Sequence, residues 1–216
     1  MSALNLGALG DLPVEVLGLV FDFARVRTQN EKHNPRSLSQ PHMSLTATNK
    51  HFYDVRRHLY LRLNRKYSLK YYQDEEFRAH VHSRLENPSK QLSLNLSKCN
   101  NITDVSALGG VHTLDLSGCW NITDVSALGG VHTLNLSRCW KIADVSALGG
   151  VHTLDLSECS NITDVSALGG VHTLNLSDCH NITDVSALGG VHTLTLSGCS
   201  KIADVSALGG VHTLIR

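Results

Sequence analysis

A tandem repeat of 20 residues constrains the fold more than any other feature of this sequence. The unit NITDVSALGGVHTLDLSGCW, at residues 101–120, recurs from residues 121, 141, 161 and 181 without insertions, and another copy begins at residue 201. A unit of this length cannot bury its own apolar face, so the copies must stack on one another as a solenoid. We therefore expect an elongated array over the second half of the chain.

Each copy has a pattern typical of one short strand followed by a turn. In the second copy, Leu134 and Leu136 alternate with an outward polar residue, as in a half-buried strand. Asp124 can accept backbone N–H bonds two residues further on, and Gly129 and Gly130 let the chain re-enter the next strand. So short a unit leaves room for an extended segment or a single turn between strands, but not for a full helix.

The period places seven parallel strands in one sheet, which at roughly 4.8 Å between strands would be roughly 30 Å long. The strands are expected near residues 92–96, 111–116, 131–136, 151–156, 171–176, 191–196 and 211–215.

The repeated V-x-x-L-x-L-x-x-C stretch resembles the leucine-rich repeat family, whose pattern is LxxLxLxxN/C. Cys stands where many members have Asn, and the resemblance runs from Leu92 to the C-terminus. It implies that residues 91–216 form a leucine-rich-repeat solenoid with a parallel sheet. It also implies that the concave strand face and its adjoining loops bind a partner protein.

Differences between copies mark the expected target-binding surface. Fifteen of the twenty positions are constant across the five complete copies, whereas the outward strand position, the residue before Cys and the residue after it vary. Trp and Arg, which are enriched at binding hot spots, occur among them. The alternative is that these residues are merely tolerated after recent duplication. The expected target-binding residues are Asp115, Trp120, Asn135, Arg138, Trp140, Asp155, Glu158, Asn175, Asp178, His180 and Thr195.

The repeated polar residues do not indicate an enzyme. Asp104, Ser106 and His112 could be drawn as a triad, but every copy offers the same set, whereas a catalytic site is one asymmetric constellation. The six cysteines occur once per unit without any CxxC pair, which argues against zinc. We expect buried thiols that fill space, parallel side chains that disfavour disulfides, and neither catalytic residues nor a cofactor.

One histidine per repeat should form a row of imidazoles about 5 Å apart. Neighbouring positive charges disfavour joint protonation, so we expect the solenoid to lose stability below about pH 6. The row comprises His112, His132, His152, His172, His192 and His212.

The two parts of the chain differ in composition. Residues 1–90 carry 14 Lys and Arg against 9 Asp and Glu, and residues 91–216 carry 5 against 10, so the overall net charge is zero. This balance argues against a nucleic-acid binder that relies on bulk positive charge. No apolar run approaches the length of a membrane span, and the first 25 residues lack a basic signal-peptide region, so we expect an intracellular protein, cytoplasmic or nuclear.

The ends of the solenoid need caps. Residues 61–90 are expected to be a linker with an N-terminal capping helix over Asp74–Glu86, because Phe77, Val81 and Leu85 recur every four residues. No C-terminal cap is expected, since the sequence stops in mid-strand. Either the gene is truncated or another chain covers this end, which would allow self-association.

Two N-terminal segments suggest a helical domain at residues 8–60. L-P-V-E-V-L-G-L-V-F, at 12–21, predicts a helix with Pro in its first turn, and L-T-A-T-N-K-H-F-Y-D-V follows at 45–55. Together they resemble an F-box, which implies docking on the Skp-type adaptor of a cullin–RING ubiquitin ligase. The matching positions are Leu12, Pro13, Leu17, Phe21, Leu45, Asn49 and Phe52.

The expected fold is therefore α/β, with a short all-helical F-box-like domain before the solenoid. The expected function is that of a non-enzymatic substrate receptor in an SCF-type ligase, in a eukaryotic cell or the host cell of a virus. The alternative is a leucine-rich-repeat scaffold whose N-terminal helices only cap the solenoid.

Overall fold

The computed structural model describes residues 61–85 and 87–216. The F-box-like segment, with Leu12, Pro13, Leu17, Phe21, Leu45, Asn49 and Phe52, lies outside the described residues.

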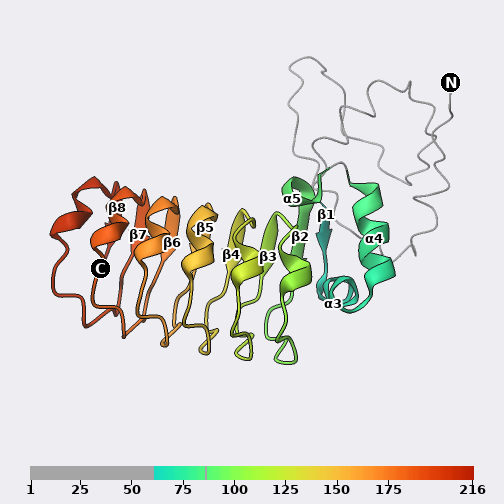
Figure 1. The fold of residues 1–216 in the computed structure, drawn as a ribbon, viewed down its shortest axis with the longest axis horizontal. Coiled ribbons are helices and arrows are strands. Elements are labelled where there is room, and N and C mark those ends of the chain that lie inside the picture. The colour runs from blue at the N-terminus through green and yellow to red at the C-terminus, as the bar shows by residue number, and fades with distance from the viewer. Residues whose placement is uncertain (1–60, 86) are drawn as a thin grey trace, which may run out of the picture.

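N-terminal helices are followed by a leucine-rich-repeat solenoid in which one parallel sheet runs along the whole rod (Figure 1). The sheet has eight strands that pair in sequence order. They are β1 (Leu61–Leu63), β2 (Leu92–Asn95), β3 (Thr113–Asp115), β4 (Thr133–Asn135), β5 (Thr153–Asp155), β6 (Thr173–Asn175), β7 (Thr193–Thr195) and β8 (Thr213–Ile215).

The α/β solenoid predicted from the period is confirmed, with one strand more than expected. Strand β1 comes from residues that the sequence pattern assigned to a linker. Leu61 pairs with Leu92 and Leu63 with Leu94, so a single L-x-L extends the same apolar columns outside the repeats. This strand lacks the rest of the repeat unit, which is why the periodicity does not reveal it.

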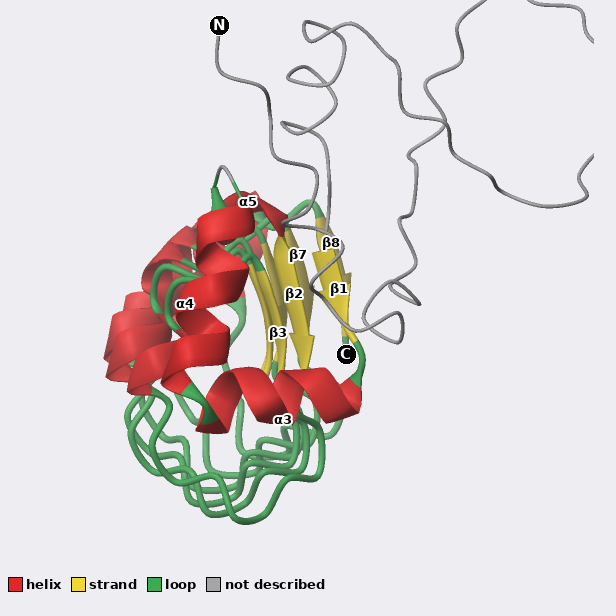
Figure 2. Ribbon diagram, turned by 90° about the vertical axis from the view of Figure 1, so that its right-hand side faces the viewer, coloured by secondary structure: helices red, strands yellow, loops and turns green. Residues whose placement is uncertain are grey.

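Single 3-10 turns lie on the side of the rod opposite the sheet, as the short period predicts (Figure 2). Each follows an Asp whose side chain accepts a backbone bond, such as Asp124 Oδ1 from Ser126 N at 2.8 Å. The turns are η1 (Ser106–Leu108), η2 (Ser126–Leu128), η3 (Ser146–Gly150), η4 (Ser166–Gly170), η5 (Ser186–Gly190) and η6 (Ser206–Gly210). We call one strand with its turn and connecting loops a rung.

The core consists of columns of identical residues, one from each rung. In the second copy Ile122, Leu128, Val131 and Leu136 are fully buried. The register keeps like on like, since Leu134 pairs with Leu154 and Leu154 with Leu174. Each interior rung is thus covered by a neighbour on both sides, which is what a stacked array requires.

Residues 61–91 close one end of the columns with helices α3 (Arg65–Gln73), α4 (Glu75–Arg84) and α5 (Pro88–Gln91) (Figure 2). Tyr67, Tyr71, Phe77 and Val81 are buried there. Helix α4 corresponds to the predicted capping helix, and Asp74 begins it by accepting a bond from Phe77 N at 2.9 Å.

Two buried polar groups fasten this cap. Ser68 Oγ donates to Leu63 O at 3.1 Å and accepts from Asn95 N at 3.0 Å, which joins α3 to the sheet. The Tyr71 hydroxyl is hydrogen bonded to His82 Nε2 at 2.5 Å, which joins α3 to α4. Burial raises the pKa of Tyr71 to about 12, so its proton stays in place.

At the other end, the side chains of Leu214 and Ile215 are exposed. The self-association expected at this end stays a prediction. Within 61–85 and 87–216, no helix is long and apolar enough to cross a membrane.

At one position in each repeat, the close approach of the next rung leaves no space for a side chain and requires glycine. A Cβ at Gly149 would lie 2.3 Å from the Ala167 carbonyl oxygen. The equivalent Gly209 has nothing within 4 Å of its Cβ position, and neither glycine has a positive φ. The two positions therefore differ only in whether another rung stacks on them.

Gly149→Ala should destabilise the protein by about 1–3 kcal/mol, because backbone must move to admit the methyl group. Gly209→Ala should be neutral or stabilise by up to about 1 kcal/mol, because it only restricts the unfolded chain. Urea unfolding of both variants checks this, and equal midpoints would show that rung-to-rung contact does not set the glycine requirement.

Candidate functional site

Two of the variable positions follow each strand and form two parallel rows, which we call the loop edge. Both rows flank the buried cysteine of their rung. The first row is Lys98, Gly118, Arg138, Glu158, Asp178 and Gly198, and the second is Asn100, Trp120, Trp140, Ser160, His180 and Ser200.

The first row lies in the left-handed backbone region, which favours glycine. Gly118 and Gly198 have φ values of 70° and 76°, and the four non-glycine residues have values of 57–61°. A side chain in this region costs of order 1 kcal/mol. The turn therefore gives no reason for charged residues on four rungs, and their side chains are candidates for a role outside the turn.

The charges of this row change sign along the rod. Lys98 and Arg138 come first, and Glu158 and Asp178 follow. Arg138 Nε and Nη2 donate to Glu158 Oε1 at 2.9 and 2.8 Å. Both side chains of this pair stay largely exposed, so the pair contributes little to stability.

Trp120 and Trp140 are large aromatic side chains that remain exposed on the loop edge. Their rings stack with centroids 5.7 Å apart, and they remain 41% and 47% exposed. They are also the two tryptophans of the whole sequence. Large aromatic side chains left in water on a folded surface are characteristic anchors for a partner.

The predicted target-binding residues on the strands also have a role in the fold. Asp115 and Asp155 each accept a bond from the backbone N of the serine two residues on, at 2.9 Å, and Asn135 and Asn175 do the same at 2.9 and 3.0 Å. This turn bond accounts for the Asp and Asn residues of this row without any partner. Thr195 holds the same row on β7.

His180 is held by its neighbour rung, because its Nδ1 lies 2.9 Å from Gly198 O.

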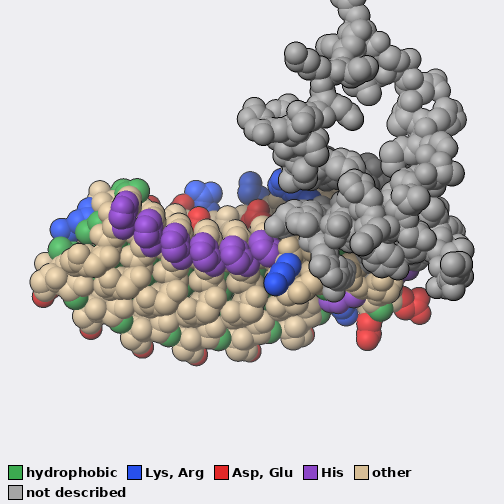
Figure 3. All heavy atoms as spheres, turned by 90° about the horizontal axis from the view of Figure 1, so that it is seen from above, with side chains coloured by type: hydrophobic (Ala, Val, Ile, Leu, Met, Phe, Trp, Pro, Cys, Tyr) green, Lys and Arg blue, Asp and Glu red, His purple; other side chains and the backbone are tan. Residues whose placement is uncertain are grey.

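The histidine row is continuous on the surface (Figure 3). Successive rings from His112 to His212 stack with centroids 4.5–4.6 Å apart and planes within 14°. Each Nδ1 lies 3.1–3.3 Å from the hydroxyl of the following threonine, such as Thr133 beside His132. Burial, and then the charge of His132, lower the pKa of His112.

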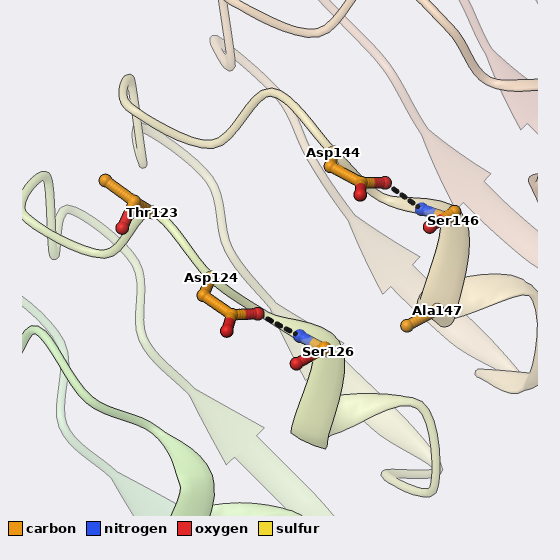
Figure 4. A pocket seen from close by; sticks show the side chains of 6 residues that line it. All are labelled: Thr123, Asp124, Ser126, Asp144, Ser146 and Ala147. Carbon is orange, nitrogen blue, oxygen red and sulfur yellow. Dashed lines mark hydrogen bonds between the residues drawn. The ribbon is translucent and has the colours of Figure 1, made fainter.

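A row of aspartates borders open hollows near the 3-10 turns, and Figure 4 shows one of them. Asp124 and Asp144 each use one carboxylate oxygen to accept the backbone N–H of Ser126 and Ser146. These bonds hold the pKa of both carboxyl groups below the usual value. The acids therefore serve the turns, and nothing else about the hollow indicates a reaction.

The cysteines do more than fill space. The Cys139 thiol donates to Leu116 O at 3.3 Å, and Cys159 to Leu136 O at 3.2 Å, so each bonds to the preceding rung. All six are free thiols. Burial raises the pKa of Cys139 and Cys159 to about 12, which makes them poor nucleophiles. The sequence pattern indicated the burial but not the hydrogen bonds.

The triad considered from the sequence is not assembled. Asp104 bonds to the backbone of Ser106, while the His112 ring contacts Thr113. In the described part of the chain, no three His, Cys, Asp or Glu residues are grouped so that they could hold a metal ion.

A family model described as Leucine Rich repeat matches residues 171–188. No curated protein matches the sequence. Together with the parallel sheet of 20-residue rungs, the match indicates a leucine-rich-repeat fold, which is typically a non-enzymatic binding scaffold. This match lies outside residues 8–60 and gives no support to their resemblance to an F-box.

Among solved structures, the chain is similar to three proteins of Listeria monocytogenes. It is 25% identical to an internalin (inlF), with a TM-score of 0.42 over 61% of this chain and 40% of that one. It is 22% identical to internalin C2, with a TM-score of 0.35 over 57% and 69%. It is 20% identical to the functional domain of InlJ, described as including a cysteine ladder, with a TM-score of 0.40 over 58% and 29%. The chain thus spans less than half of the first and third of these proteins.

Acidification from pH 7.5 to 5 should lower the melting temperature. The lowered pKa of His112 means that the unfolded chain binds the proton more tightly than the folded chain does, so stability falls as pH drops through about 6.5. Carboxylates such as Asp124, whose pKa is also lowered, lose their contribution only near and below about pH 4.

His82 acts in the same direction, because burial and then Arg78 lower its pKa. The control is therefore a His112→Gln/His132→Gln variant, which should show a smaller drop over the same interval. A melting temperature of the wild type that does not change between the two pH values would refute the effect.

Proposed function

We propose that this chain is a non-enzymatic binding protein that holds a partner protein against its loop edge. The observation that carries the proposal is the exposed Trp120–Trp140 stack, which lies on two rows that vary while fifteen of the twenty positions of the rung are constant. Apolar anchors surrounded by charged residues are the usual composition of a protein interface.

The shape of the surface favours a macromolecular partner over a small molecule. The loop edge continues across six rungs, or about 24 Å at the usual strand spacing of about 4.8 Å. Small-molecule sites are enclosed clefts with convergent polar groups. Arg138 and Glu158, in contrast, are exposed and spread along an open edge.

The repeat array supplies its own control substitution, because Ser160 and Ser200 occupy the position of the two tryptophans. A Trp120→Ser/Trp140→Ser variant should therefore keep the wild-type melting temperature and lose partner binding. Crosslinking capture with both proteins, followed by mass spectrometry, measures the difference. If the variant retains every protein that the wild type captures, the loop edge is not the binding surface.

A finer proposal is that residues 8–60 act as an F-box, so that the bound protein becomes the substrate of a cullin–RING ligase. It rests on the two sequence segments that contain Leu12-Pro13 and Asn49. The cap formed by β1, α3, α4 and α5 already covers the end of the solenoid, so capping gives no reason for these segments.

The purified chain should bind a Skp-type adaptor, and Leu12→Ala/Pro13→Ala should abolish this binding while the solenoid stays folded. A pull-down with circular dichroism of both proteins checks it. Failure of the folded wild type to bind would leave a leucine-rich-repeat scaffold without a ligase role.

A further inference from the structure

The charged residues of the loop edge follow an order that is complementary to itself. Because the strands pair in register, rungs are evenly spaced and each residue of the row has a fixed place. The order is Lys98, Gly118, Arg138, Glu158 and Asp178, which reads positive, neutral, positive, negative and negative.

The loop edge of a second copy, running antiparallel, presents complementary charges to this row. The match requires the twofold axis to pass between the rungs of Trp120 and Trp140. Lys98 then faces Glu158 of the second copy. Gly118 faces Arg138, so no two like charges oppose each other at these rungs. Each contact occurs twice, as an isologous interface requires.

The same axis brings the tryptophans together. Trp120 faces Trp140 of the second copy and Trp140 faces Trp120, so two exposed stacks would cover each other. The result is an aromatic centre with charged pairs on both sides, which is the normal arrangement of an interface. If the axis instead passed between Arg138 and Glu158, their charges would also match, but Trp120 and Trp140 would face His180 and Ser160.

We propose that the loop edge binds a second copy of this chain through the Trp120–Trp140 stack, as an antiparallel twofold dimer. The inference rests on the proposed function, since it names the occupant of that surface. The contact is small, so it belongs to the weak class of interfaces.

Charge reversal tests the register with substitutions that the array already accommodates. Glu158 has nearly the same left-handed backbone conformation as Lys98, so Lys98→Glu and Glu158→Lys should both fold normally. Each alone would place like charges opposite each other twice and should weaken the dimer at least tenfold. A mixture of the two variants restores both opposite-charge pairs, so a heterodimer of near wild-type affinity should form.

Analytical ultracentrifugation of the full chain over a concentration series measures these affinities. Tryptophan fluorescence gives a second signal, since both tryptophans of the sequence lie in the contact and their emission should shift to the blue on association. Trp140→Ser should abolish the dimer without changing the melting temperature.

A wild type that stays monomeric up to several hundred micromolar would overturn the dimer. So would a dimer that Lys98→Glu leaves intact, which would place the contact elsewhere, for example at β8. If the wild type is monomeric but Trp120→Ser/Trp140→Ser still loses a captured protein, the dimer is wrong and the proposed function stands. If the wild type does not dimerise and the double variant loses no captured protein, both the dimer and the proposed function are wrong.

Discussion

Stacking of identical rungs in register is the constraint on which the rest of this structure depends. A rung of 20 residues has no core of its own, so its leucines, valines and isoleucine are buried only by the same residues of the rungs beside it. The backbone follows the same rule, as His132 N donates to His112 O and His152 N to His132 O, both at 3.1 Å. A residue that contacts the next rung must therefore suit six rungs at once.

This constraint separates residues that hold the rod from residues that are free to differ. The Cys139 thiol bonds to the preceding rung, Gly149 lies against the next one, and Asn135 closes a turn. Contacts within and between rungs thus explain the constant Cys and Gly positions and the Asp and Asn residues of the strand row. They do not explain a tryptophan pair in water or charged residues in a backbone conformation that suits glycine, and the proposed binding function rests on these residues.

The sequence allowed much of the fold to be predicted because the period fixes which residues are neighbours. The strands from β2 to β8, the single turns and the stacked histidines all follow from it. Strand β1 could not be found in this way, since it shares only L-x-L with the repeats. The left-handed backbone at Arg138 was also missed, because it depends on turn geometry that side-chain patterns do not encode. The Arg138–Glu158 pair could have been predicted from the sequence, because opposite charges one period apart lie on adjacent rungs.

The central claim is that each rung is held by its neighbours, and the thiols offer one equivalent probe per rung. Cys139 and Cys159 are fully buried, whereas Cys199 is 9% exposed. Variable residues flank every cysteine, so mass spectrometry can follow alkylation at each site in the folded protein. The account predicts that Cys199 reacts first and that Cys139 and Cys159 react last. Equal rates at all six sites, or fastest reaction in the interior, would contradict it.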